Sequence, residues 1–97
     1  MNEASKTKTS YYRRLLVARL IEQGHNTVPA IMAATGMPRR TAQDTIKALA
    51  DLDVKVRFVG ANKNGYYQVD DWGAINATWI DEKLPEIQQV LGYVSHH

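Results

Sequence analysis

Residues that commonly contact nucleic acids gather between positions 39 and 47. Arg39 and Arg40 are followed by Gln43 and, one helical turn later, by Lys47. An arginine can donate two hydrogen bonds to guanine and a glutamine amide can bond adenine in a bidentate way, whereas a lysine more often meets a phosphate. These residue types point to the binding of double-stranded nucleic acid rather than to a reaction.

Catalysis and metal binding find little support in the residues. The chain has no cysteine, which excludes a disulfide, a thiolate nucleophile and a cysteine-based metal site. His25 stands alone, the serines have no neighbouring base, and no glycine-rich phosphate loop is present. The acidic residues Asp81, Glu82 and Glu86 fit a solvated helix face better than an acid/base pair. We therefore expect no enzyme, no metal and no cofactor.

Charge is divided unevenly along the chain. The formal net charge is only +2, but residues 1–69 hold eleven lysines and arginines against five acids, and residues 70–97 hold one lysine against five acids. A basic front and an acidic back suggest that only the front faces a polyanion, although charges that simply solvate the surface would look the same.

Length and composition place the chain among small globular proteins. Its 97 residues allow one domain, and 44% hydrophobic and 23% charged residues are ordinary values. The N-terminus lacks the apolar core of a signal peptide, and the longest strongly apolar stretch, 15–18, is far shorter than the ~20 residues of a membrane helix. Without cysteines, this predicts a cytoplasmic protein with no membrane partner.

Three helices are predicted in the first half. Residues 1–9 are polar and predict a flexible arm, after which Ser10 can cap a helix over 11–23. Thr27 can cap a short second helix that ends at Gly36. A third helix is expected over about 38–52, with its inward positions at Ala42, Ile46 and Leu49.

A hairpin and a C-terminal helical segment are predicted in the second half. Val54, Val56 and Phe58 alternate with polar residues, and Asn64-Gly65 is a strong turn signal, which together predict a hairpin over 54–69. Asp70 or Asp71 is then expected to cap a helical segment within 71–97. Pro85 would either kink one helix or begin a second.

The stretch VPAIMAATGMPRRTAQDTIKALADL, from Val28 to Leu52, strongly resembles the winged helix-turn-helix family. It has a short helix, a Thr-Gly-apolar turn, and a helix with apolar residues at its fifth, ninth and twelfth positions counted from Pro38. The resemblance covers about residues 10–70, and the C-terminal part is similar to small bacterial winged-helix proteins of unassigned role. It implies an α+β, mostly α, fold: a three-helix core plus a two-stranded β-hairpin wing, with one or more extra C-terminal helices.

The resemblance and the residue types together predict sequence-specific binding of double-stranded DNA by a bacterial transcriptional regulator. The helix at 38–52 would enter the major groove, and the wing tip at 60–65 would lie near the backbone or the minor groove. The expected DNA contacts are Arg39, Arg40, Thr41, Gln43, Asp44, Lys47, Lys63, Arg13 and Arg14. No small-molecule effector is assigned.

Two of these residues leave alternatives open. The carboxylate of Asp44 faces phosphates badly; it could accept from a cytosine amino group or pair with Arg40 or Lys47. Lys63 could contact the backbone or belong to a merely polar hairpin tip. The alternative function is a protein–protein interaction module that does not bind DNA.

The C-terminal segment carries a candidate dimer interface. Its apolar residues are spaced 4, 3, 4, 3, which is the heptad seam by which helices pair. They are Ile80, Leu84, Ile87, Leu91 and Val94. The alternative is that this stripe covers the chain's own domain. We expect a homodimer that places its two DNA-reading helices about one turn of DNA apart.

Overall fold

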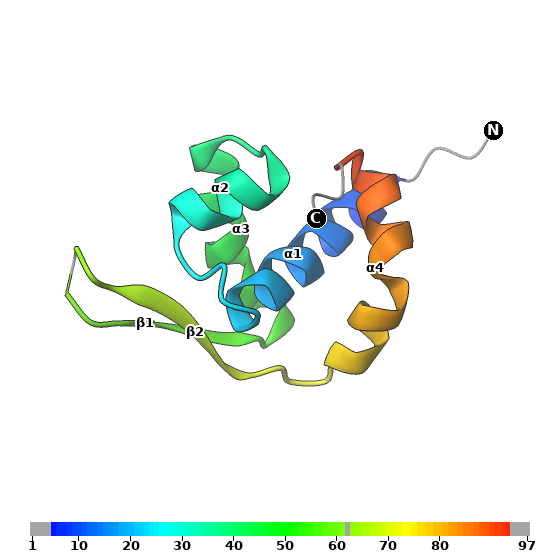
Figure 1. The fold of residues 1–97 in the computed structure, drawn as a ribbon. Helices are drawn as coiled ribbons and strands as arrows, with labels where there is room; N and C mark the ends of the chain where they lie inside the picture. Colours follow the sequence, from blue (N-terminus) through cyan, green and yellow to red (C-terminus); the bar gives the residue numbers. More distant parts are fainter. Residues whose placement is uncertain (1–4, 62, 94–97) are drawn as a thin grey trace.

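The computed structural model describes residues 5–61 and 63–93, which form three helices, a β-hairpin and a fourth helix (Figure 1). The predicted three-helix core, two-stranded wing and C-terminal helix are confirmed. The elements are α1 (Lys6–Glu22), α2 (Val28–Thr35), α3 (Arg39–Ala48), the 3-10 turn η1 (Leu49–Leu52), β1 (Lys55–Val59), β2 (Tyr66–Asp71) and α4 (Ala77–Leu91). Within the described ranges, no helix is both long and apolar enough to cross a membrane.

Helix α1 begins earlier than predicted. Its N-cap is Ser5, whose side chain accepts a hydrogen bond of 3.1 Å from the backbone N of Lys8. The predicted cap at Ser10 and the predicted arm reaching to residue 9 are therefore wrong. The apolar pattern could not find these first turns because they project only polar side chains, and either serine can satisfy the free N–H groups at a helix start.

The turn between α2 and α3 forms as predicted. Thr27 caps α2 by accepting from the backbone N of Ala30 at 3.2 Å, and Gly36 ends the helix at φ 80°, a left-handed conformation that glycine adopts without strain. In α3 and the η1 turn that follows, the predicted inward residues Ala42, Ile46 and Leu49 are buried. This burial fixes which side of α3 remains free.

The hairpin is antiparallel, and β2 extends two residues beyond its predicted end. Asp70 and Asp71 therefore lie in the strand, and neither caps the next helix. Asp70 instead accepts hydrogen bonds from Arg57 across the hairpin. The cap of α4 is Asn76, whose side chain accepts from the backbone N of Thr78 at 2.9 Å.

The alternation of Val54, Val56 and Phe58 with polar residues is typical of a half-buried strand and predicts Phe58 on its apolar face, but Phe58 is 47% exposed. It shares a face with Val56, yet the hairpin projects beyond the helices at this point (Figure 1). Its ring meets Tyr67 edge-on at 5.1 Å between centroids. It also covers Gly65, where a Cβ would come within 2.1 Å of the ring. The aromatic pair thus packs the outer hairpin where the helical core does not reach.

Helix α4 packs on α1 of the same chain. Ile80 and Ile87 are completely buried against an apolar face of α1 formed by Tyr12, Leu15 and Leu16. The partly buried Leu84 and Leu91 belong to the same cluster, and Val94 lies outside the described residues. The prediction that these residues form an exposed dimer seam is therefore wrong. The 4-3 spacing also suits packing against a helix of the same chain, and here that helix is α1. Pro85 lies within one continuous helix.

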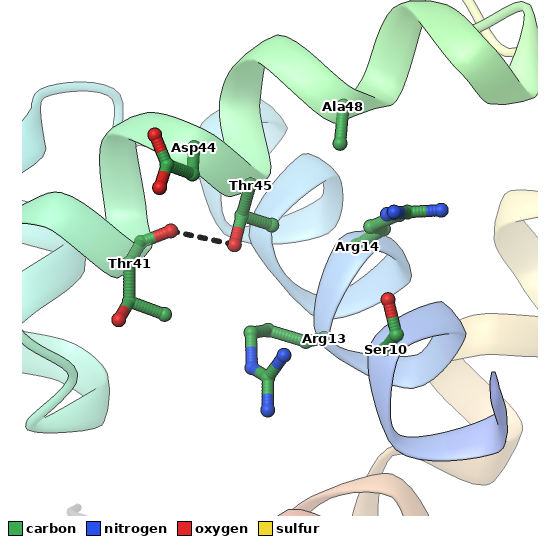
Figure 2. Close-up of a pocket in the computed structure, with 7 residues that line it drawn as sticks. All are labelled: Ser10, Arg13, Arg14, Thr41, Asp44, Thr45 and Ala48. Carbon is green, nitrogen blue, oxygen red and sulfur yellow. Dashed lines mark hydrogen bonds between the residues drawn. The ribbon is translucent and has the colours of Figure 1, made fainter. Parts of the chain in front are cut away.

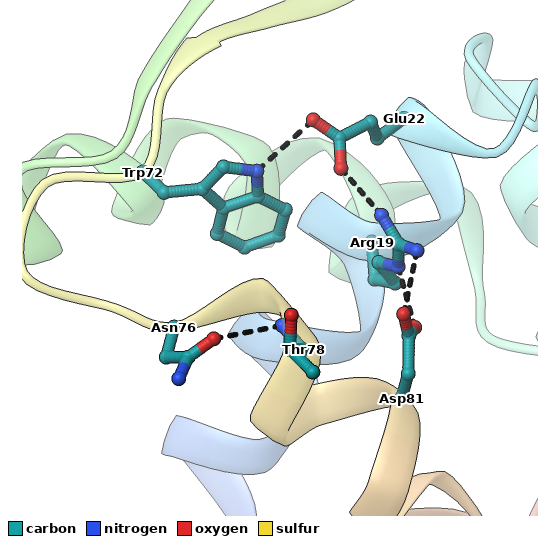
Figure 3. Close-up of polar contacts among 6 residues, drawn as sticks. All are labelled: Arg19, Glu22, Trp72, Asn76, Thr78 and Asp81. Carbon is teal, nitrogen blue, oxygen red and sulfur yellow. Dashed lines mark hydrogen bonds and ion pairs between the residues drawn. The ribbon is translucent and has the colours of Figure 1, made fainter.

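Polar contacts hold the start of α4 beside the end of α1 (Figure 3). Arg19 donates two hydrogen bonds to Asp81, at 2.6 and 2.7 Å, and is also paired with Glu22. The bonds to Asp81 raise the pKa of the Arg19 guanidinium above its ordinary value. Glu22 in turn accepts a bond of 3.0 Å from the indole N–H of Trp72. Asp81, one of the acids of the C-terminal segment, is thus paired with a cation of the same chain.

Candidate nucleic-acid interface

Helix α3 has one free face, and that face is polar. Ala42, Thr45 and Ile46 are buried against the core, so the side chains opposite them project into solvent. The exposed side chains are those of Arg39, Arg40, Gln43, Asp44 and Lys47, while Thr41 is half-buried at one edge. Ten residues of α-helix span about 15 Å, and a major groove about 12 Å wide admits one helix. The sequence correctly predicted that these residues share a free surface.

Asp44 is loosely paired on this face. Its Oδ2 lies 3.8 Å from Nε of Arg40, one turn earlier, and the two side chains are 66% and 92% exposed. An ion pair this exposed contributes little to stability and is easily exchanged for another partner. Pairing with Arg40 was one of the two alternatives for Asp44. Both groups remain available to a ligand that approaches α3.

Two arginines of α1 lie at one edge of the α3 face. A pocket of about 260 Å³ separates the helices, and its lining residues are Ser10, Arg13, Arg14, Thr41, Asp44, Thr45 and Ala48 (Figure 2). Residues about thirty positions apart in the sequence thus meet at one place. Thr45 is buried, and its hydroxyl donates to the carbonyl of Thr41 at 2.6 Å. The sequence pattern predicts a helix cap at Ser10, whereas the structure places Ser10 within α1, where it lines this pocket.

The hairpin contributes a second basic region. Lys63 is exposed, and the end of the hairpin that holds it extends away from the helices (Figure 1). Arg57 is occupied, since it donates to Asp70 at 2.8 and 3.2 Å. The bond from Arg57 lowers the pKa of Asp70, because it stabilises the charged carboxylate. Lys55 and Lys63 form no ion pair with another residue that the structure describes, so they are better placed than Arg57 to meet a polyanion.

Comparison with known proteins adds two findings. A protein-family model described as winged helix-turn helix matches residues 6–91, from the start of α1 to the end of α4. The crystal structure of a DUF2131 family protein from Shewanella amazonensis SB2B is similar to this chain, with 34% sequence identity and a TM-score of 0.87. The similarity covers 95% of this chain and 92% of that chain. Among curated proteins, no match is found.

Proposed function

We propose that this chain, which belongs to the winged helix-turn-helix family, binds double-stranded DNA sequence-specifically through the free face of α3. The observation that carries the proposal is the gathering of Arg39, Arg40, Gln43 and Lys47 on that face, with the hydrophobic core on the opposite side of the helix. In helix-turn-helix domains, the helix after the tight turn lies in the major groove. Here that helix is α3, and the turn is the one at Gly36.

Each side chain has a role that its chemistry and place favour. Arg40 and Gln43 lie in the first half of α3, where side chains reach base edges, and both can form two bonds to one base. Arg39 and Lys47 would neutralise phosphates on either side of the groove. Lys63 at the end of the hairpin would contact the backbone or the minor groove, independently of base sequence.

Salt dependence tests this function without knowledge of the preferred site. If one protomer neutralises about three phosphates, the slope of log affinity against log salt should be roughly −3 on pooled random duplexes. Two protomers on one duplex should give roughly −5. The measurement is a fluorescence-anisotropy titration from low to moderate salt. No binding at micromolar protein in low salt would contradict the proposal.

The same slope bears on oligomeric state. A homodimer stays a prediction, and the burial of Ile80 and Ile87 means that its interface would lie elsewhere than on that seam. Light scattering on the free protein, together with the slope, distinguishes a dimer that exists beforehand from two protomers that meet only on DNA.

Removal of the one carboxylate on the α3 face should strengthen binding. We expect Asp44→Asn to raise affinity for random duplexes by severalfold at low salt, because a negative charge beside the phosphates is lost. Asp51→Asn, which changes the same charge on the exposed η1 turn beyond α3, is the matched control and should have a smaller effect. A loss of affinity for one particular duplex in Asp44→Asn would instead indicate that Asp44 reads a cytosine.

The biological role that follows from such binding is regulation of transcription. We infer a regulator that acts in a bacterial cytoplasm. This is consistent with the excess of basic residues in 1–69 and with a family that is typically non-enzymatic. The support is the winged helix-turn-helix fold itself.

A further inference from the structure

The pocket between α1 and α3 has the composition of an anion site. Arg13 and Arg14 enter it from α1, and the half-buried Thr41 and the neighbouring Ser10 add hydroxyl groups (Figure 2). Arg13 extends toward the half of α3 that holds Thr41, while Arg14 lies on the side of Ala48. The two guanidinium groups therefore lie at different parts of the pocket lining.

The Nε of Arg13 has no acceptor among the residues that the structure describes. This atom is buried, and within the same part of the chain neither Arg13 nor Arg14 forms an ion pair. Buried N–H groups are nearly always bonded, and one without a partner is destabilising. The nearest carboxylate in the pocket lining, that of Asp44, is directed instead to Arg40. An acceptor from a bound ligand would supply the hydrogen bond that the buried Nε of Arg13 does not make within the described residues.

We propose that this pocket binds a phosphoryl group. A phosphoryl group presents several oxygens in different directions, which suits two arginine forks and two hydroxyls better than the planar pair of oxygens of a carboxylate. With Asp44 included, the ionisable groups of the lining still carry a net positive charge. The volume of about 260 Å³ lies just below the range of about 300–1,000 Å³ for drug-sized ligands, so a small anionic group fits the space.

The phosphoryl group can come from two sources. One is a small phosphorylated molecule, and the other is the backbone of a duplex lying on α3, since Thr41 and Asp44 border both the pocket and the free face. Binding of a free phosphoryl group does not depend on DNA binding. It can be measured without DNA, so the failure of one proposal is distinguishable from the failure of the other.

Titration of the full chain with inorganic phosphate tests the site. The arginine Nε–H signals are followed by NMR, and sodium chloride at matched ionic strength is the control. We expect a saturable shift of the Arg13 signal at millimolar phosphate or below, and no such shift with chloride. A shift that does not saturate, or that chloride reproduces, would overturn the proposal.

Variants separate the pocket from general charge. Arg13→Gln should weaken phosphate binding roughly tenfold or more, as followed by the Arg14 signal, while Arg13→Lys keeps the charge but loses the fork and should be intermediate. Lys83→Gln removes one exposed charge on α4 and should bind as wild type. Wild-type affinity in both Arg13 variants, with the fold verified by circular dichroism, would overturn the site.

Competition identifies the source of the phosphoryl group. If phosphate weakens duplex binding severalfold more than chloride of equal ionic strength, the pocket holds a backbone phosphate when DNA is bound. If duplex affinity is unchanged while phosphate still saturates the pocket, the ligand is a small phosphorylated molecule. Either result supports the site and assigns its ligand.

Discussion

The variants Ile80→Ala and Ile87→Ala are each expected to lose about 2–5 kcal/mol of the free energy of unfolding. Both side chains are completely buried between α4 and α1, so truncation removes apolar contact and leaves a cavity. Small domains are stabilised by only about 5–15 kcal/mol in total, so either change is large. Urea denaturation followed by circular dichroism measures the loss, with Lys83→Ala on the exposed side of α4 as control.

A glutamate at position 87 distinguishes packing within one chain from packing between two chains. The heptad seam would predict that Ile87→Glu gives a folded monomer, because a partner surface would be disrupted. The observed packing predicts that the variant unfolds, since an unpaired carboxylate would be buried in the core. A folded Ile87→Glu variant, or losses below about 1 kcal/mol in the alanine variants, would show that α4 does not belong to the core.

Loss of Arg40 or Gln43 is expected to cost about 1–3 kcal/mol of binding free energy on the preferred DNA site and to relax the sequence preference. Both side chains are exposed on the first half of α3, where base edges would lie. Gln43→Ala is the more informative change because the side chain is neutral. Its loss of affinity should leave the salt slope unchanged, whereas Arg40→Ala also removes a charge.

Two further variants complete that comparison. Lys63→Ala should weaken all duplexes alike and reduce the salt slope by about one, because a phosphate contact carries no sequence information. Lys83→Ala, on α4, should bind as wild type. If Arg40→Ala, Gln43→Ala and Lys63→Ala all bind as wild type on every duplex, α3 and the hairpin are not the DNA surface.

Local signals were enough to predict the helix-turn-helix and the hairpin. The capping by Thr27 and the left-handed turn at Gly36 depend on residues close in sequence, and the structure has them where the sequence placed them. The hairpin loop spans the predicted 60–65, but neither Asn64 nor Gly65 has the positive φ of a tight two-residue turn, and the backbone N of Asn64 donates to the carbonyl of Ala61 instead. The inward positions of α3 followed from helical periodicity alone. The free face of α3 could therefore be predicted as well, since it is the remainder of that helix.

The errors arose where distant segments compete for the same side chains. Asp70 can cap a helix or pair with a cation. Only the hairpin register places Arg57 opposite Gln68, two residues before Asp70 in β2, and so within reach of its carboxylate. The stripe on α4 fits a second chain or α1 equally well by spacing, and α1 happens to offer a matching apolar face. The pocket at Arg13 and Arg14 depends on how α1 lies against α3, which no sequence period encodes.

Selection of bound duplexes from a random DNA pool tests the central claim most directly. The account predicts enrichment of a short motif with guanine or adenine at defined positions, read by Arg40 and Gln43. In the Gln43→Ala variant, the preference at one adenine should disappear while the rest of the motif is retained. Bound duplexes with the same base composition as the input pool, or no duplex retained in low salt, would contradict sequence-specific DNA binding by α3.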